Sequence, residues 1–373
     1  MSGVLSRYLY NLFRMCGFAG VVTWDDRYRV SPETLAKMSA AVAHRGPDGE
    51  GAFINHQEQV TADRPQVALA FRRLAILDPD PRSNQPFSDG RFWLVFNGEI
   101  YNFRELRKEL TSLRPDYSWR TTGDTEVLLC AFAVWGEKCV EHLNGMFAFV
   151  VWDEREKSLF LARDRMGQKP LYYTNCESAI AFASEMVPLR ELPWFDGWIS
   201  NESLVDYLAM GYCPGESAIY GRVRNLLPST FLIGGTRRYQ KQYFQRNPVR
   251  RELEDGKSVR DRVMQSVGQQ MVSDVPIGCF LSGGMDSSII AASMVASRGE
   301  VSTFSVGFDD GMYDERSFAA AVARHLGTKH EELLVRPDVA SDLPGLAEVF
   351  GEPFADSSSL PMHYLAKATR AHV

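Results

Sequence analysis

The sequence predicts two domains: an α+β domain built on antiparallel sheets, followed by an α/β domain built on a parallel sheet. A chain of 373 residues is long enough for two cores at the usual size of roughly 150 residues per domain. From Met15 to about Leu189, short apolar runs alternate with turn residues and a few helical patterns, which is typical of antiparallel sheets with helices packed on them. After about Ser258, strand and helix patterns alternate three times, which indicates a parallel sheet with crossover helices.

The strands of the first domain are predicted from apolar runs that are bounded by turn residues. Two of these runs flank the charged residues 154–157, so we expect them to form a hairpin. The predicted strands cover residues 17–23, 67–76, 92–97, 147–152, 158–162 and 179–183.

Helices are expected between these strands. The first begins after Ser31, whose hydroxyl can cap it, with Pro32 at its first position. Leu35, Met38 and Val42 then follow at helical spacing as a buried stripe. The other two helices are expected over residues 103–110 and 124–135, the second of them ending at Gly136.

Residues 191–257 are predicted to connect the domains, because prolines and glycines interrupt any sustained period there apart from a helix near 204–210. The second domain is expected from residue 258 to 373 and to be incomplete, because its final helical pattern should feed a further strand. Its predicted strands cover 277–281, 301–308 and 331–335, and its helices cover 286–296, 315–326 and 360–373, after a first helix that follows Ser258.

Composition and charge narrow the class of protein. The 41 Lys and Arg against 47 Asp and Glu give a formal charge of −6, so composition gives no reason to expect nucleic-acid or membrane partners. Hydrophobic residues at 45% and charged residues at 24% are ordinary globular values. Six cysteines without a CxxC pair, and no apolar run long enough for a bilayer, favour a cytoplasmic protein with free thiols.

Cys16 is the first candidate for chemistry. It follows Met15 and precedes Gly17, and removal of Met15 would leave Cys16 with a free α-amine. That amine can accept the thiol proton, which is how an N-terminal nucleophile works. We therefore expect residues 1–15 to be a leader that is absent from the mature protein. On spacing alone, the alternative is a small buried apolar side chain in the first strand.

Three polar clusters follow apolar elements, at residues 45–48 (RGPD), 97–102 (NGEIYN) and 123–126 (GDTE). Taken singly, each is an ordinary turn or helix cap. Together with Cys16, and in the same order, they resemble the class II glutamine amidotransferase domain of the glutamine-hydrolysing asparagine synthetase family. This likeness runs from Cys16 through Leu189.

The resemblance implies an αββα N-terminal-nucleophile sandwich and a role for each matching residue. Cys16 would attack the glutamine side-chain amide, and Asn97 with the Gly98 N–H would stabilise the oxyanion. Arg73 would hold the substrate α-carboxylate by two hydrogen bonds, and Glu99 with Asp124 would bind its α-ammonium.

The second strong motif is 281–288 (LSGGMDSS), which stands between a predicted strand and a predicted helix. Glycines let the backbone approach a ligand, and a helix N-terminus offers N–H groups to a pyrophosphate. The spacing is neither that of a Walker A loop nor GxGxxG, and a plain tight turn is the alternative. The motif resembles the loop of ATP pyrophosphatases, which are adenine nucleotide α-hydrolase-like, and the synthetase half of the same family.

This second likeness implies a binding site for ATP. Asp286 would bind Mg²⁺, which bridges phosphate oxygens, and Leu281 with Val306 would frame the adenosine. Residues 313–315 and 352–358 show a weaker likeness to later segments of the family. The pyrophosphate would be cradled by Ser282, Gly283, Gly284, Ser287 and Ser288.

The two likenesses together imply a glutamine-dependent carbon–nitrogen ligase, an asparagine synthetase. Glutamine hydrolysis would supply ammonia to β-aspartyl-AMP made from aspartate and ATP, and the products would be asparagine, glutamate, AMP and pyrophosphate. Two alternatives stay open: a relative that amidates another carboxylate in secondary-metabolite, peptide or polysaccharide biosynthesis, and a catalytically silent protein that binds glutamine or nucleotide. Small-molecule substrates and a possible homodimer are the expected partners.

Overall fold

The computed structural model describes residues 15–55, 57–235, 239–245, 256–308, 314–336 and 338–370. These residues form two compact units, and each is described by itself. The sandwich unit draws on residues 15–245 and 345–356, and the parallel unit draws on residues 256–344 and 357–370. The predicted leader lies outside the described residues except for Met15.

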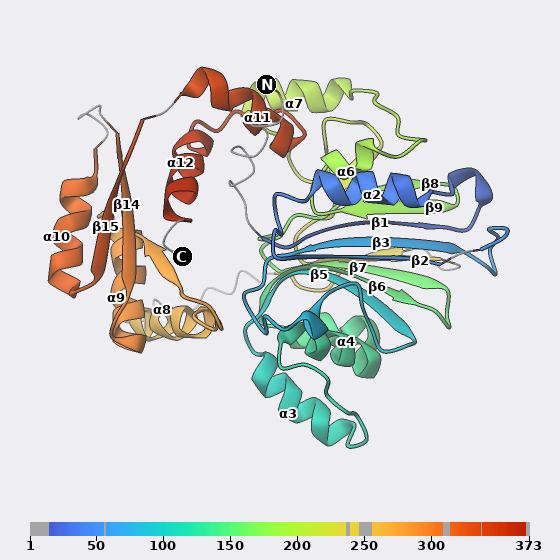
Figure 1. Ribbon diagram of the computed structural model, residues 1–373, viewed down its shortest axis with the longest axis horizontal. Helices are drawn as coiled ribbons and strands as arrows, with labels where there is room; N and C mark the ends of the chain where they lie inside the picture. The colour runs from blue at the N-terminus through green and yellow to red at the C-terminus, as the bar shows by residue number, and fades with distance from the viewer. Residues whose placement is uncertain are drawn as a thin grey trace. The chain divides into compact units, whose positions relative to one another are not determined.

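Two six-stranded antiparallel sheets form the centre of the sandwich unit (Figure 1). The first has the order β10-β8-β9-β1-β3-β2, and the second has the order β12-β11-β7-β6-β5-β4. The bounds in the first sheet are β1 (Gly17–Thr23), β2 (Gly49–Ile54), β3 (Gln66–Arg73), β8 (Tyr172–Cys176), β9 (Ala179–Ala183) and β10 (Val223–Asn225). Those in the second are β4 (Phe87–Ser88), β5 (Phe92–Ile100), β6 (Gly145–Asp153), β7 (Ser158–Arg163), β11 (Thr230–Gly234) and β12 (Tyr239–Gln242).

Helices cover the outer faces of both sheets. Ser31 caps α2 as predicted, because its Oγ accepts a hydrogen bond from the Thr34 N–H at 3.2 Å. Helix α2 lies over the first sheet with α6, and α3 with α4 covers the second (Figure 1). Their bounds are α2 (Pro32–Ala41), α3 (Phe103–Leu113), α4 (Asp124–Trp135), α5 (Cys139–His142), α6 (Val187–Arg190) and α7 (Asn201–Met210), with short 3-10 turns at Asp26–Tyr28, Pro81–Ser83 and Gly136–Lys138.

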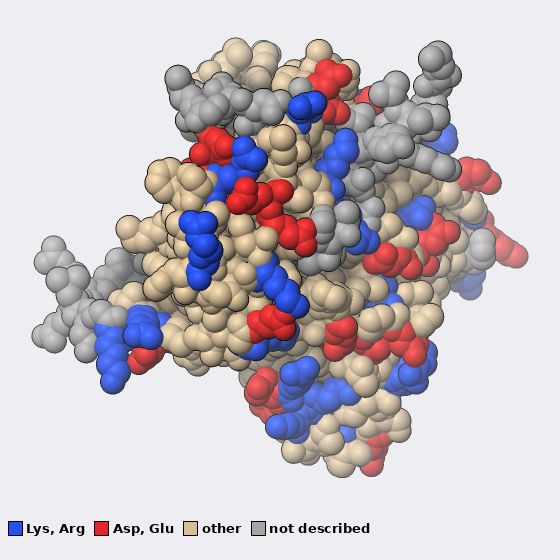
Figure 2. Space-filling view, turned by 60° about the vertical axis from the view of Figure 1, so that its left-hand side comes forward, with Lys and Arg blue, Asp and Glu red and all other residues tan. Residues whose placement is uncertain are grey.

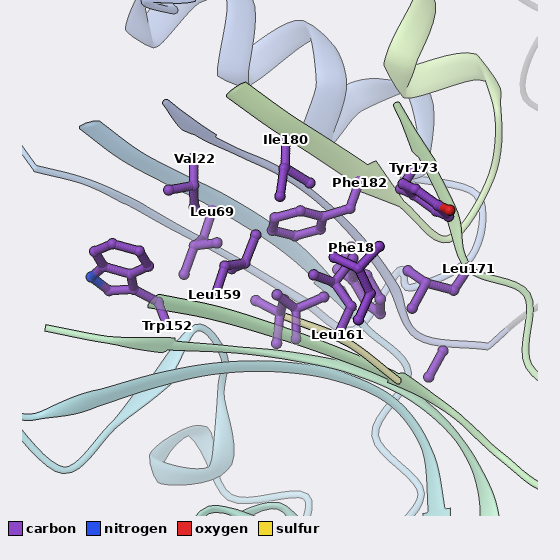
Figure 3. Close-up of a cluster of buried hydrophobic side chains, with 14 of the residues drawn as sticks. Phe18, Val22, Leu69, Trp152, Leu159, Leu161, Leu171, Tyr173, Ile180 and Phe182 are labelled. Atoms are coloured by element: carbon purple, nitrogen blue, oxygen red, sulfur yellow. The ribbon is translucent and has the colours of Figure 1, made fainter. Parts of the chain in front are cut away.

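Alternation along β1 explains why the unit has four layers. Phe18 and Val22 point between the two sheets, where they join the cluster drawn in Figure 3. Ala19 and Val21 lie on the opposite face and pack with side chains of α2, among them Met38. Because β1 is buried on both faces, its sequence has no polar side chain before Thr23. The predicted αββα fold is confirmed.

The parallel unit contains a three-stranded sheet of order β13-β14-β15, whose neighbouring strands are parallel. Val267 of α8 and Met294 of α9 contribute to its small core, together with Cys279 of β13. The predicted alternation of strand and helix is therefore confirmed. The bounds are α8 (Gly256–Gln270), β13 (Gly278–Phe280), α9 (Met285–Arg298), β14 (Ser302–Phe308), α10 (Arg316–Leu326), β15 (Lys329–Val335) and α12 (Ser359–Thr369). The residues of α11 (Val339–Phe350) are divided between the two units after Pro344.

The structure corrects the prediction that residues 191–257 only connect the domains. Strands β10, β11 and β12 lie in this range and extend the two sheets of the sandwich at their edges. Strands β10 and β12 are three and four residues long, and β12 is exposed at every position, so neither shows the apolar pattern that reveals a strand. Strand β11 is a mostly buried run of five residues that was missed. Strands β2, β4 and β8 were also not predicted, nor was α11, whose Pro344 breaks the helical pattern.

The surface and the cysteines fit the ordinary composition. Basic and acidic side chains are interspersed over a largely uncharged face (Figure 2). None of the six cysteines, all of which lie in the described residues, forms a disulfide. No helix among the residues that the structure describes combines the length and apolarity that crossing a bilayer requires.

The packing between the sheets predicts the effect of a cavity. Leu161 of β7 is fully buried there, so Leu161→Ala should lower the free energy of unfolding by about 2–5 kcal/mol. Leu208 of α7 is 74% exposed, and Leu208→Ala is the matched control, with a change below about 0.5 kcal/mol. Denaturant unfolding followed by tryptophan fluorescence measures both, and equal losses would contradict this packing.

Candidate active site

The Cys16 thiol lies at the entry to β1, against the backbone of Leu74. The Leu74 N–H donates to Sγ at 3.4 Å, and the thiol in turn approaches the Leu74 carbonyl oxygen at 3.5 Å. Burial raises the pKa of this thiol to about 11, and the nearby charges of Glu99 and Asp124 also raise it, whereas Arg73 lowers it. With a peptide bond on its nitrogen, Cys16 is therefore almost entirely a thiol at neutral pH.

The cluster at residues 45–48 holds the start of β1. Arg45 Nε donates to the Cys16 carbonyl oxygen at 3.0 Å, and its NH1 donates to the Glu185 carboxylate at 2.6 Å. His44 Nε2 lies 3.0 Å from the same carboxylate oxygen. A Cβ on Gly46 would stand 2.3 Å from the backbone carbon of Arg72. The cluster thus stabilises the backbone at the start of β1, and Gly46 allows close contact with β3.

Asn97 has an unusual environment on β5. Its side chain is 1% exposed, and neither its amide nitrogen nor its amide oxygen has a hydrogen-bond partner among the described residues. An unpartnered buried amide costs free energy, so such a group calls for an explanation. The next residue, Gly98, has no room for a side chain, because a Cβ there would lie 2.1 Å from the Met146 carbonyl oxygen. The Asn97 amide is therefore a group whose unmet hydrogen bonds a ligand could satisfy.

Asp124 is placed by the start of α4. Its Oδ2 accepts from the Ile100 N–H at 2.9 Å, and burial raises the pKa of its carboxyl to about 6. Asp78 holds the preceding turn, because its Oδ2 accepts from the N–H groups of Thr122 and Gly123 at 2.7 and 3.2 Å. Glu99 follows Asn97 and Gly98 on β5. These two carboxylates give the neighbourhood of the thiol a negative character.

Arg73, at the end of β3, is buried and already bound. The hydrogen bonds of its two terminal nitrogens occupy all four hydrogens on them, so the loop after β3 fixes the guanidinium before any ligand arrives. The predicted two-pronged contact with a carboxylate therefore requires at least one of these bonds to be given up. The acceptors are the carbonyl oxygens of Leu77 (3.2 Å), Asp78 and Asp80 (2.9 Å) and Oδ1 of Asn84 (2.9 Å).

Lys169 was not predicted from the sequence, yet it lies in this neighbourhood. It is 4% exposed, and burial, with the charge of Arg45, lowers its pKa to about 8, while Glu99 and Cys16 raise it. The Asp164 carboxylate accepts from the Lys169 N–H at 3.0 Å and so fixes this turn. The sequence signal that could have indicated it is a lysine between Gly167 and Pro170, just before strand β8.

A second cluster forms at residues 281–288 in the parallel unit. Gly283 has φ +81°, and a Cβ there would lie 2.6 Å from Phe318, so this turn requires glycine. Helix α9 begins directly afterwards, and the hydroxyls of Ser282 and Ser287 lie 3.0 Å apart. A pocket of about 230 Å³ opens here; its lining includes Leu281, Ser282, Ser287, Val306 and Glu315.

Asp286 is the predicted magnesium ligand, and it stands exposed in the first turn of α9. No group of three or more His, Cys, Asp or Glu side chains that could hold a metal occurs among the described residues. Mg²⁺ often binds through one or two carboxylates and the oxygens of a phosphate. Asp286 therefore suits a magnesium ion that arrives with a nucleotide, not one held by the protein alone.

The two segments with a weaker likeness to the family, residues 313–315 and 352–358, are only partly described or belong to different units. Tyr313 lies outside the described residues, and Asp314 forms an ion pair with Arg316 at 2.7 Å. Glu352 belongs to the sandwich unit, where its carboxylate accepts from the Tyr172 hydroxyl at 3.0 Å and the Ile219 N–H at 3.1 Å.

Comparison with known proteins identifies the family of each part of the chain. Residues 15–245 match the model of a glutamine amidotransferase domain, and residues 258–373 match that of an asparagine synthase domain. "Asparagine synthetase [glutamine-hydrolyzing] 1" of Bacillus subtilis is 38% identical over 96% of this chain and 56% of its own. A putative asparagine synthetase of Mycobacterium tuberculosis is 34% identical (91% and 54%), and one of Methanocaldococcus jannaschii is 30% identical (96% and 72%).

The class is therefore a glutamine amidotransferase domain joined to an asparagine synthase domain. The chain belongs to the glutamine-hydrolysing asparagine synthetase family, as its sequence motifs predicted. It spans about half the length of the first two of these relatives.

The close contact at Gly98 gives a prediction about stability. Gly98→Ala should force β5 away from β6 and lower the melting temperature by about 3–10 °C, because overpacking costs about 1–3 kcal/mol. Gly49→Ala on β2 is the control, since its Cβ would meet nothing closer than 3.4 Å. Thermal unfolding followed by circular dichroism checks this, and indistinguishable melting temperatures would refute the contact.

Proposed function

We propose that this protein hydrolyses glutamine at Cys16 and uses the ammonia to make asparagine from aspartate and ATP. The observation that supports it most is the buried, unpartnered amide of Asn97, two residues before a carboxylate whose charge acts on the Cys16 thiol. An amide without a partner is free to donate to a charge that develops during reaction. The names of the relatives, glutamine-hydrolysing asparagine synthetases, support the same reaction.

In the first half-reaction, Cys16 Sγ attacks the side-chain amide carbon of glutamine. The carbonyl oxygen becomes an oxyanion, which the Asn97 amide and the Gly98 N–H stabilise. Collapse of this intermediate breaks the C–N bond, and the thiol proton leaves with the nitrogen as ammonia. Water then hydrolyses the thioester to glutamate and restores the thiol.

A base is required, because a thiol with a pKa of about 11 is ionised in only about one molecule in ten thousand at pH 7. An α-amine, with an ordinary pKa near 7.7–8.0, can accept the thiol proton if Cys16 is the first residue. We therefore propose that the active form begins at Cys16 and lacks residues 1–15.

Charged groups near Cys16 suit the α-amino acid end of glutamine. Asp124, with a pKa of about 6, is ionised at neutral pH and, with Glu99, would bind the α-ammonium. Arg73 would bind the α-carboxylate, in exchange for one of the hydrogen bonds that now hold its guanidinium. This exchange would make the contact selective. A ligand whose carboxylate did not replace the hydrogen bond that Arg73 gives up would bind weakly.

The second half-reaction would use the 281–288 loop. Its serine hydroxyls, its glycine backbone and the first turn of α9 suit the pyrophosphate of ATP, and Leu281 with Val306 suits the adenosine. Asp286 would hold the Mg²⁺ that accompanies the nucleotide and neutralises phosphate charge. Aspartate would displace pyrophosphate to give β-aspartyl-AMP, and ammonia would then displace AMP.

The names of the relatives favour aspartate over another carboxylate acceptor. A catalytically silent protein is less favoured, because the thiol, the Asn97 amide and both carboxylates are present together. A cytoplasmic location and a homodimer stay predictions.

The nucleophile is tested with a diazo-ketone analogue of glutamine, which alkylates an activated thiol. Peptide mass spectrometry should find the label on Cys16 in protein that begins there, and Asn97→Ala should lower kcat for glutamine hydrolysis about 10²–10³-fold. Cys176→Ser, at another half-buried cysteine, should change neither. Failure of correctly trimmed protein to take label at Cys16 would overturn the proposal.

The nucleotide site is tested by calorimetry. Asp286→Asn should weaken ATP binding about tenfold or more with Mg²⁺ present and little in EDTA, whereas Asp261→Asn on α8 should bind like the wild type. Release of AMP across a panel of carboxylates then identifies the acceptor, and we expect aspartate. An equal loss of ATP affinity with Mg²⁺ and in EDTA would show that Asp286 does not bind the metal.

A further inference from the structure

Lys169 is a buried cation for which the proposed reaction has no role. It is 4% exposed, and among the described residues no carboxylate lies within ion-pair distance of its Nζ. The contact recorded for its ammonium is with the sulfur of Met15, the residue bonded to the Cys16 nitrogen. A buried charge without a partner is costly, and such groups cluster at functional sites.

The turn that bears Lys169 is rigid. The Asp164 carboxylate accepts from the backbone N–H groups of Met166, Gln168 and Lys169, each at 3.0 Å. The Lys169 carbonyl oxygen accepts from Arg163 Nε at 2.7 Å. The backbone of Lys169 is thus fixed independently of Met15, and its side chain ends beside Met15, the residue before Cys16.

Four groups act electrostatically on the Lys169 ammonium: Arg45, Glu99, Cys16 and Asp164. They come from the segment after α2, from β5, from the entry to β1 and from the segment after β7. Only Arg45 has a charge of the same sign, and it is already paired with Glu185. The ammonium therefore faces the thiol and the future α-amine with its charge uncompensated by an ion pair.

We propose that Lys169 is a positioning residue for the N-terminal nucleophile, a fixed internal cation that keeps the freed α-amine of Cys16 unprotonated and favours the thiolate. This inference rests on the proposed function. Nζ contacts the sulfur of Met15, the residue bonded to the Cys16 nitrogen, so the α-amine that removal of Met15 frees would be a neighbour of Nζ. Two ammonium groups at such a distance repel, so the α-amine loses its proton more easily, and the same cation attracts the thiolate.

Both effects favour the form that attacks glutamine. An α-amine must be neutral to accept the thiol proton, and its ordinary pKa would leave most of it protonated at neutral pH. Lys169 supplies the electrostatic bias without touching the substrate, and for that reason it is not a catalytic residue.

The test compares Lys169→Met, Lys169→Arg and the control Lys108→Met on the exposed face of α3. Each protein is released from an N-terminal fusion by a protease that leaves Cys16 first, so that all of them begin alike. Two quantities are measured against pH: kcat/KM for glutamine hydrolysis and the rate of Cys16 alkylation by the diazo-ketone analogue.

We expect Lys169→Met to move the acid limb of both profiles upward by about one pH unit, because its α-amine holds a proton to higher pH. Lys169→Arg should restore the limb, and Lys108→Met should match the wild type. An acid limb that stays in place in Lys169→Met, with activity reduced equally at every pH, would overturn the inference. If the wild type neither hydrolyses glutamine nor takes label at Cys16, the proposed function itself fails.

Discussion

The buried pair of Arg45 and Glu185 is the interaction on which the candidate site depends. Glu185 follows β9 and Arg45 follows α2, so the pair joins the strand paired with β1 to the helix that packs on β1. Through its Nε, Arg45 also holds the carbonyl oxygen of Cys16. A buried ion pair is weak evidence for stability, since desolvation offsets much of the attraction. The pair holds Cys16 in position, which matters in the form that we propose to be active, because the first residue of a chain otherwise frays.

Burial then gives the site its chemistry. The thiol of Cys16, the carboxyl of Asp124 and the ammonium of Lys169 all have pKa values shifted toward the uncharged form, in each case with burial as the largest cause. In such surroundings each remaining charge acts on its neighbours over a longer range than in water. A small change in the protonation of one group therefore alters the others, which is how one cation can bias a nucleophile that it does not contact.

Particular residues show what the sequence could and could not predict. The strand from Gly17 to Thr23 was placed correctly because apolar residues there are bounded by turns, and α2 was placed because Ser31 and Pro32 signal a helix start. Short edge strands such as β12 were not predicted, because their backbone pairs with a neighbouring strand while their side chains stay exposed. The burial of Lys169 was not predicted. It results from a turn that the Asp164 carboxylate stabilises, and such a turn leaves no periodic pattern in the sequence. Arg73 was found, but the four hydrogen bonds that occupy it depend on the path of the loop after β3.

The Asn97 amide at the first candidate site and the serine hydroxyls at the second differ in whether their hydrogen bonds are already made. At the first, the Asn97 amide is buried and unsatisfied, so a ligand that accepts its hydrogen bond removes a cost the folded protein already bears. At the second, Ser282 and Ser287 are bonded to each other, and Ser287 and Ser288 donate to the Gly284 carbonyl oxygen. A polyphosphate must exchange these bonds for its own, and only a strongly charged acceptor at the N-terminus of a 14-residue helix makes that exchange favourable. In the function that we propose, the Asn97 amide would thus favour a ligand through an unmet hydrogen bond, and the 281–288 loop would favour one through its charge.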